Sequence, residues 1–99
     1  MCGITGIWNY KTGSPANRER LTHITRLIAH RGPDGEGFYW GPGAGLGHRR
    51  LSIIDLEGGH QPMCNEDGTI WIVFNGEIYN FPELRHELEQ RGHVLRTKS

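Results

Sequence analysis

The stretch TIWIVFNGE, residues 69–77, decides the fold class, because it joins the longest apolar run of the chain to an Asn-Gly pair. Five consecutive apolar side chains predict a strand over Thr69–Phe74 that is buried on both faces. Asn75-Gly76 then has two interpretations. It is typical of a tight hairpin turn. It also sets an amide side chain beside a glycine N–H, the donor pair that forms an oxyanion hole in acyl transfer.

A helix is predicted directly after this stretch. Asn80 suits the N-cap position, and Glu83 three residues later completes a capping-box arrangement with Asn in place of Ser or Thr. Two leucines then share one face and a glycine ends the helix, at Leu84, Leu88 and Gly92. The alternation of strand and helix signals indicates one layered α+β domain.

Further elements are predicted on both sides of this core. They are a strand over Cys2–Tyr10, a helix from Asn17 to about His30, strands over Phe38–Trp40 and Gly45–Leu56, and the start of a strand over residues 93–96. The first helix is expected to bury one face, made of Leu21, Ile24, Leu27 and Ile28. The chain stops after this last strand signal, so we expect it to be part of a larger domain.

Composition narrows the function classes. Ninety-nine residues hold one core, and eleven Lys and Arg balance eleven Asp and Glu, so no cationic face for nucleic acid or a membrane surface is expected. The five-residue apolar run is far shorter than the ~20 residues that span a bilayer. Since no secretory signal is recognisable either, a cytoplasmic location is expected. Cys2 and Cys64 lack the spacing of a disulfide framework or a zinc site.

Cysteine at position two is the first candidate for chemistry. Removal of the initiator Met is expected before a small residue, and it would leave Cys2 with a free α-amine beside its own thiol. An unprotonated α-amine can take the thiol proton, directly or through a water, so no catalytic histidine is required. The alternative is that Cys2 is merely a small residue at a frayed terminus.

Two adjacent arginines are a second candidate. Arg49 and Arg50 lie within a predicted strand, so their side chains leave on opposite faces and only one can face a site, the other being solvated. An inward arginine fork would bind a carboxylate in bidentate fashion, which suits an acidic or amino-acid substrate. The six histidines lack the spacing of a metal site and are expected to be surface or structural residues, so no metal is assigned.

Five separated segments together carry a resemblance. They are Met1-Cys2-Gly3-Ile4, Arg31-Gly32-Pro33-Asp34, His48-Arg49-Arg50-Leu51-Ser52-Ile53, Gln61-Pro62-Met63 and Phe74-Asn75-Gly76-Glu77-Ile78-Tyr79-Asn80. In this order they resemble the class II glutamine amidotransferase domain at the amino terminus of glutamine-hydrolysing asparagine synthetases, over the whole of residues 1–99. The resemblance implies an N-terminal-nucleophile hydrolase fold, a four-layer αββα sandwich, of which this chain would be about the first half.

The resemblance also implies residue roles. Cys2 would attack the side-chain amide of L-glutamine, and water would then hydrolyse the γ-glutamyl thioester. Asn75 and the N–H of Gly76 match the oxyanion donors, Arg50 the ligand of the substrate carboxylate, and Glu77 a ligand of its α-ammonium group. Leu51 and Ile53 match positions whose backbone lines the glutamine pocket. A further aspartate of the ammonium site is expected just beyond the end of this sequence.

The resemblance extends to partners and leaves alternatives open. It implies a carboxy-terminal synthetase domain in cis, absent from this chain, with ATP and Mg²⁺ there and no cofactor in this segment. That domain would convert aspartate to asparagine with the released ammonia, and a homodimer stays open. Two alternatives remain, namely an amidotransferase with another carboxylate acceptor and an inactive binding module. Residues 1–99 alone are expected to bind glutamine weakly or not at all, because half a sandwich exposes its sheet.

Overall fold

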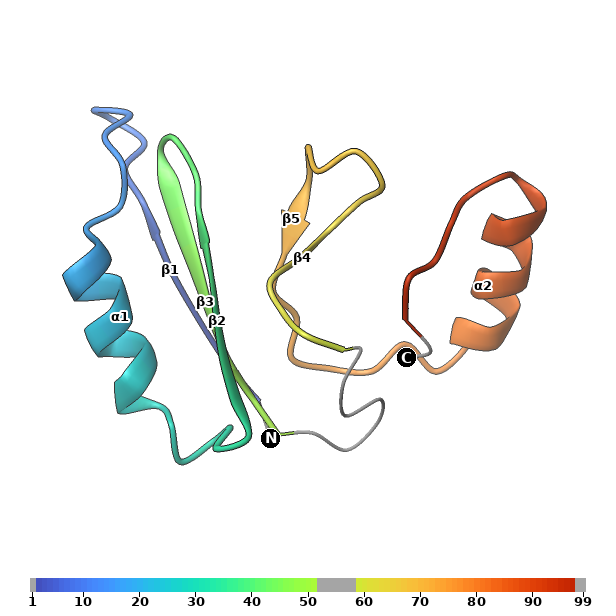
Figure 1. The fold of residues 1–99 in the computed structure, drawn as a ribbon, viewed down its shortest axis with the longest axis horizontal. Helices are drawn as coiled ribbons and strands as arrows, with labels where there is room; N and C mark the ends of the chain where they lie inside the picture. The colour runs from blue at the N-terminus through green and yellow to red at the C-terminus, as the bar shows by residue number, and fades with distance from the viewer. Residues whose placement is uncertain (1, 52–58, 98–99) are drawn as a thin grey trace.

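The computed structural model describes residues 2–51 and 59–97, and in these ranges the chain is an α+β structure with two sheets and two helices. Figure 1 shows four successive layers, which are helix α1, a three-stranded sheet, a two-stranded sheet and helix α2. The elements are β1 Gly3–Trp8, α1 Arg18–Leu27, β2 Gly35–Trp40, β3 Ala44–Arg50, β4 Met63–Cys64, β5 Trp71–Ile72 and α2 Phe81–Gln90. None of the helices in these ranges is long and apolar enough to cross a membrane.

The three-stranded sheet has the order β1-β3-β2, and both pairings are antiparallel. Strand β3 is central and carries two glycines, Gly45 and Gly47, on the face that meets α1. A Cβ on Gly45 would lie 2.8 Å from the Leu21 side chain, and one on Gly47 would collide with Thr25. These glycines therefore let the helix approach the sheet closely, and the alternation of side chains turns His48 toward the opposite face.

Helix α1 begins as predicted. The Asn17 side chain caps it by accepting a hydrogen bond from the Arg20 N–H at 2.9 Å. Leu21 and Thr25 are fully buried, and the Thr25 hydroxyl donates to the Leu21 carbonyl at 2.7 Å. The predicted apolar face is wrong at Leu27, which is 62% exposed. The helix instead buries Thr25, because its hydroxyl can remain hydrogen-bonded against the glycine-rich strand.

The two-stranded sheet differs from the expected buried strand. Strand β5 pairs antiparallel with β4, a strand the sequence did not indicate, and it covers only Trp71–Ile72 of the predicted Thr69–Phe74. Burial on both faces is wrong, because the described chain covers neither face fully and leaves large side chains exposed at Ile70, Ile72 and Phe74. The hairpin turn is held by side chains, since Asn65 Oδ1 accepts from the N–H groups of Thr69 and Ile70.

Helix α2 lies where it was predicted, but it is not capped as predicted. Asn80 has φ −97° and ψ 27° instead of extended backbone, and its side chain makes no cap hydrogen bond. Gly92 ends the helical turn with a φ of 91°. No strand forms over residues 93–96, which is a second correction.

The remaining strand predictions are confirmed with shifted bounds. Strand β1 lies within the predicted Cys2–Tyr10, β2 extends the predicted Phe38–Trp40 backward to Gly35, and β3 ends at Arg50. The predicted continuation of β3 toward Leu56 lies mostly outside the described residues. The two sheets contact each other where the Tyr39 and Trp71 rings stack with centroids 4.5 Å apart.

Candidate active site

Cys2 is held from both sides where the chain enters the sheet. Gly3 pairs with Arg49 across β1 and β3, so Cys2 lies beside the end of β3. The Leu51 N–H donates a hydrogen bond to the Cys2 sulfur at 3.3 Å, and the Arg31 side chain donates to the Cys2 carbonyl oxygen at 3.2 Å. The backbone of Leu51 and the sulfur are therefore neighbours, and the thiol has a defined direction.

The two adjacent arginines leave β3 on opposite faces, as predicted. Arg50 is buried, with 6% of its surface exposed, on the face away from α1. Arg49 lies on the α1 side, where it donates to Glu36 Oε2 at 2.8 Å and to the Gly32 carbonyl at 3.0 Å. The expectation that this second arginine is solvated is wrong, because Glu36 is its register partner on β2. A buried guanidinium one residue from Leu51 is suited to bind a carboxylate.

The segment 75–77 lies exposed between β5 and α2. Within the described ranges, neither the Asn75 amide nor the Gly76 N–H has a hydrogen-bond partner, and Glu77 forms no ion pair. The hairpin interpretation of Asn75-Gly76 is wrong. The chain continues into a helix instead of a return strand, and Gly76 is not among the residues with positive φ, which a type I′ turn requires. Both donors of the pair thus remain available to a ligand.

Four residues connect the segment to the sheet. Gly37 pairs with His48 across β2 and β3, and a Cβ on Gly37 would overlap the carbonyl of Gln61. The Gln61 side-chain oxygen accepts a hydrogen bond from the Phe74 N–H at 2.6 Å. The Phe74 backbone also lies within reach of the buried His48 ring, close enough to act on its pKa. We name Gly37, His48, Gln61 and Phe74 the junction, because they join the sheet of Cys2 to the segment of Asn75.

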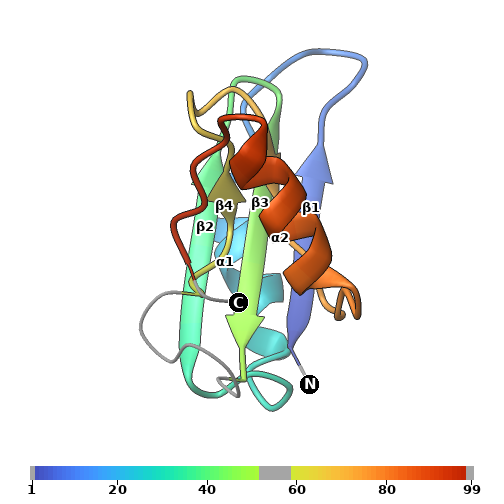
Figure 2. The ribbon, with the colours of Figure 1, turned by 90° about the vertical axis from the view of Figure 1, so that its right-hand side faces the viewer.

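The junction lies close to Cys2 along the strand. His48 is the register partner of Ile4, two residues from Cys2, which corresponds to about 7 Å along β1. Figures 1 and 2 place the segment between β5 and α2 in the same half of the molecule as the start of the chain. The structure therefore places Cys2 against Leu51, which follows Arg50, and connects the Asn75-Gly76 segment to the same sheet. Ile53 lies outside the described residues.

The surroundings of His48 lower its pKa. The ring is 1% exposed and lies two residues from Arg50 on the same face. Burial, and next the positive charge of Arg50, lower the pKa of His48 from its ordinary value of 6.5, while the hydrogen bond with Phe74 opposes this. The imidazole is therefore neutral at pH 7.

Sequence reasoning missed three residues of this region. His48, Gln61 and Arg31 were expected to be structural or were not assigned. No periodicity or spacing identifies them, because each acts through a backbone group that is distant in sequence. Their only signal is that all three lie inside the segments that carry the resemblance.

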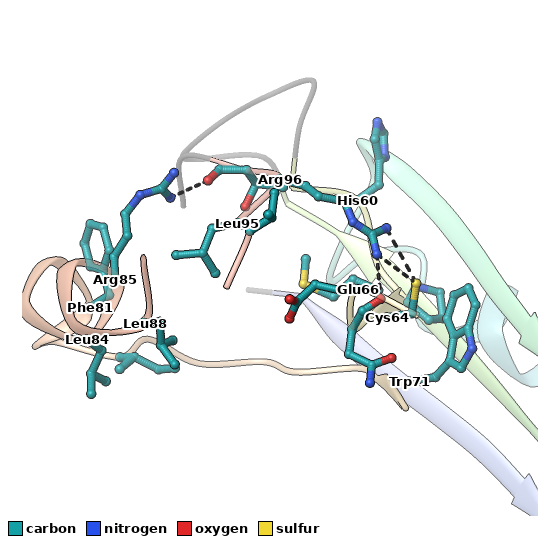
Figure 3. Close-up of a pocket in the computed structure, with 16 residues that line it drawn as sticks. His60, Cys64, Glu66, Trp71, Phe81, Leu84, Arg85, Leu88, Leu95 and Arg96 are labelled. Atoms are coloured by element: carbon teal, nitrogen blue, oxygen red, sulfur yellow. Dashed lines mark hydrogen bonds between the residues drawn. The ribbon is translucent and has the colours of Figure 1, made fainter. Parts of the chain in front are cut away.

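A cavity of about 570 Å³ lies elsewhere, between the two-stranded sheet and α2. Figure 3 shows Phe81, Leu84 and Leu88 on one side of it, with Cys64 and Trp71 on the other. Its wall is largely apolar, and none of the predicted site residues lines it. The cavity is therefore a gap between layers and not the predicted glutamine pocket. In the described ranges, no three His, Cys, Asp or Glu side chains group so that they could hold a metal ion.

Comparison with known proteins identifies the family of the chain. A family model described as a glutamine amidotransferase domain matches residues 1–99, and the chain belongs to that family. Among curated relatives, all of it is similar to glutamine-hydrolysing asparagine synthetase 1 of Bacillus subtilis (strain 168), at 48% identity over 101 residues. Asparagine synthetase 1 of Arabidopsis thaliana is 44% identical over 99 residues, and asparagine synthetase B of Escherichia coli (strain K12) is 43% identical over 91, or 92% of this chain. The chain spans only 16% to 17% of the length of these relatives.

Proposed function

We propose that this chain is part of a glutaminase in which Cys2, freed at its amino end by removal of Met1, is the nucleophile. The observation that carries the proposal is the position of the Cys2 sulfur, 3.3 Å from the backbone nitrogen of Leu51, the residue that follows buried Arg50. A sulfur next to a buried arginine suits a substrate that has a carboxylate and a carboxamide in one small molecule, as L-glutamine does.

The reaction has two steps. The Cys2 thiol gives its proton to the α-amine, and the sulfur bonds to the carbonyl carbon of the side-chain carboxamide. The oxygen gains negative charge, which the Asn75 amide and the Gly76 N–H receive, and ammonia leaves with the transferred proton. Water then attacks the thioester, releasing glutamate and restoring the thiol. Arg50 binds the α-carboxylate, Glu77 the α-ammonium group, and the backbone at Leu51 and Ile53 lines the pocket.

The architecture is proposed to be an N-terminal-nucleophile hydrolase sandwich with αββα layers. The order of α1, the two sheets and α2 in Figure 1 supports this. Residues 1–99 form the amino-terminal part of the domain. The rest of the domain would complete both sheets and add an aspartate to the ammonium site.

The complete protein is proposed to use the ammonia for synthesis of asparagine from aspartate. The support is that relatives over this whole segment are named glutamine-hydrolysing asparagine synthetases. ATP and Mg²⁺ would act in a separate synthetase domain in cis, a cytoplasmic location is expected, and this segment needs no cofactor. A related enzyme with another carboxylate acceptor would share every residue discussed here, so the product formed by the complete protein decides between them.

The proposal is tested with Cys2→Ala in the complete protein. Glutamate release from glutamine should disappear, while synthesis with added ammonia should persist. Cys64→Ala is the matched control, because that cysteine lies on β4 away from Leu51 and should keep both activities. Glutaminase activity that survives in Cys2→Ala would refute the assignment. Intact-mass analysis adds a second test, because retained Met1 would favour an inactive binding module.

A further inference from the structure

We infer that His48 and Gln61 are positioning residues, which hold the Phe74 peptide so that the Asn75 amide and the Gly76 N–H face the Cys2 sulfur. The inference rests on the proposed glutaminase function and extends it to two residues that touch no substrate atom. Its basis is the junction of Gly37, His48, Gln61 and Phe74 described above.

Phe74 is held through its N–H, and its carbonyl lies near His48. The N–H donates to Gln61 Oε1 at 2.6 Å, and the backbone lies within reach of the His48 ring, where the carbonyl is the group that can accept. Fixing these two groups fixes both peptide planes around Phe74. The second of these planes includes the nitrogen of Asn75, so the direction of the following donors depends on the two side chains.

The partner side chains are themselves held by the sheet. His48 is 1% exposed on the central strand, and Gly37 opposite it has no side chain, which leaves room for the Gln61 backbone to lie against β2. By contrast, the side chain of Phe74 is 42% exposed and supplies little anchorage of its own. The position of segment 74–76 is thus set by hydrogen bonds more than by burial.

The inference assigns one tautomer to His48. Nε2 is buried and has no hydrogen-bond partner within residues 2–51 and 59–97. A neutral imidazole has one N–H and one bare nitrogen. The inference places the proton on Nδ1, facing the Phe74 carbonyl, and leaves Nε2 as the bare nitrogen. His48 therefore acts as a donor to Phe74 and not as a base.

The functional consequence concerns turnover more than binding. Oxyanion donors act on charge that develops in the transition state, and a misplacement of about 1 Å can cost about 100-fold in rate. In the proposed site glutamine is bound through Arg50, which is not part of the junction. A loosened Phe74 should therefore lower kcat and leave KM nearly unchanged.

The experiment compares two amides at position 48 in the complete protein. His48→Asn places its NH₂ group near the position of Nδ1 and should keep the bond to Phe74. His48→Gln places its amide near Nε2 and should lose that bond. We expect kcat for glutamine hydrolysis to fall about 100-fold in His48→Gln and by no more than about tenfold in His48→Asn. In both variants KM should change by less than about threefold, and ammonia-dependent synthesis should be retained.

A parallel pair tests the other bond. Gln61→Glu keeps an acceptor oxygen for the Phe74 N–H, whereas Gln61→Met keeps the length and removes it. We expect Gln61→Met to lose more kcat than Gln61→Glu. Binding of a glutamine analogue with an aldehyde in place of the side-chain carboxamide tests the donors directly, because its thiol adduct carries an oxygen at the oxyanion position. The analogue should bind more weakly to His48→Gln and Gln61→Met, while iodoacetamide labels Cys2 at the wild-type rate.

The outcomes are distinct. Equal kcat in the two position-48 variants, a loss confined to KM, or unchanged aldehyde binding would overturn the inference. If the variants fail to fold, nitrogen NMR of the wild-type protein decides, since a proton on Nε2 would contradict the bond to Phe74 and one on Nδ1 would support it. Glutaminase activity in Cys2→Ala would refute the proposed function itself. If Cys2→Ala loses the activity while both position-48 variants keep the wild-type kcat, only this inference is refuted.

Discussion

Residues 2–50 and residues 59–97 differ in how well they bury their own side chains. In the first region, α1 lies against a three-stranded sheet, and side chains such as Leu21, Thr25 and His48 are fully buried. In the second region, no described residue is buried, and α2 stands apart from the two-stranded sheet. Both regions have regular helices and strands, so secondary structure alone does not produce a core.

This difference divides the proposed site. Cys2 and Arg50 belong to the filled region, where register and burial fix them, while Asn75, Gly76 and Glu77 belong to the open one. In the proposed site, the nucleophile and the carboxylate ligand are thus part of the sheet, and the proposed oxyanion donors are connected to the sheet through the junction. The comparison teaches that a site can have one rigid part and one part that depends on a few hydrogen bonds.

The largest expected effect compares one leucine from each helix. Leu21 is 0% exposed and Leu88 is 38% exposed. Leu21→Ala should lower the free energy of unfolding of the complete protein by about 3 to 4 kcal/mol, and Leu88→Ala by about 1 kcal/mol, because less apolar surface is lost. Denaturant unfolding of both variants measures this. An equal loss would mean that residues beyond those described cover α2, and the comparison would then hold for this segment only.

The next effect compares two glycines. A Cβ on Gly32 would lie 2.5 Å from the backbone nitrogen of Arg50, whereas one on Gly76 would lie 2.7 Å from the ring of Phe74, which can rotate away. Gly32→Ala should therefore destabilise the protein by about 2 to 3 kcal/mol. Gly76→Ala should change stability by less than about 0.5 kcal/mol. Thermal unfolding distinguishes them, and a stable Gly32→Ala variant would contradict the close approach of these backbones.

Sequence patterns predicted the filled region better than the open one. The start of helix α1 at Asn17, strand β1 and the opposite faces of Arg49 and Arg50 follow from local rules, because the packed sheet and helix satisfy those rules. The run Ile70–Phe74 was predicted to be fully buried, yet its neighbours in the described chain are too few to bury it. An apolar run shows that a strand needs neighbours to bury it, but it does not show whether the described residues include those neighbours.

The site shows the same limit. Cys2, Arg50 and the Asn75-Gly76 pair could be named from residue types whose chemistry is specific. The roles inferred for His48 and Gln61 could not, because a histidine or glutamine bonded to a distant backbone group leaves no spacing signal. Only the fold brings Phe74 to them.

A smaller effect compares the two helix caps. Asn17 bonds to the Arg20 N–H, whereas Asn80 makes no cap bond. Asn17→Ala should cost about 1 kcal/mol of unfolding free energy, and Asn80→Ala about 0.3 kcal/mol. Asn17→Ser and Asn80→Ser are matched controls, because serine can cap a helix in either place. An equal cost at both positions would show that Asn80 caps α2 in solution.

The smallest expected effect is a change in the pH dependence of stability. Burial and Arg50 hold the pKa of His48 below 6.5, so in acid the unfolded chain takes up a proton at this position before the folded chain does. The contribution of His48 to stability is therefore fully present above pH 6.5 and is lost as the pH falls from there toward the lowered pKa. His48→Asn removes this titration and should flatten the fall. The measurement is denaturant unfolding of both proteins at several pH values between 5 and 8, read as the difference between them, which cancels other titrating groups. A difference that stays constant across this range would show that His48 titrates alike in both states, and the junction would then not be the buried, neutral contact that ties the open region to the filled one.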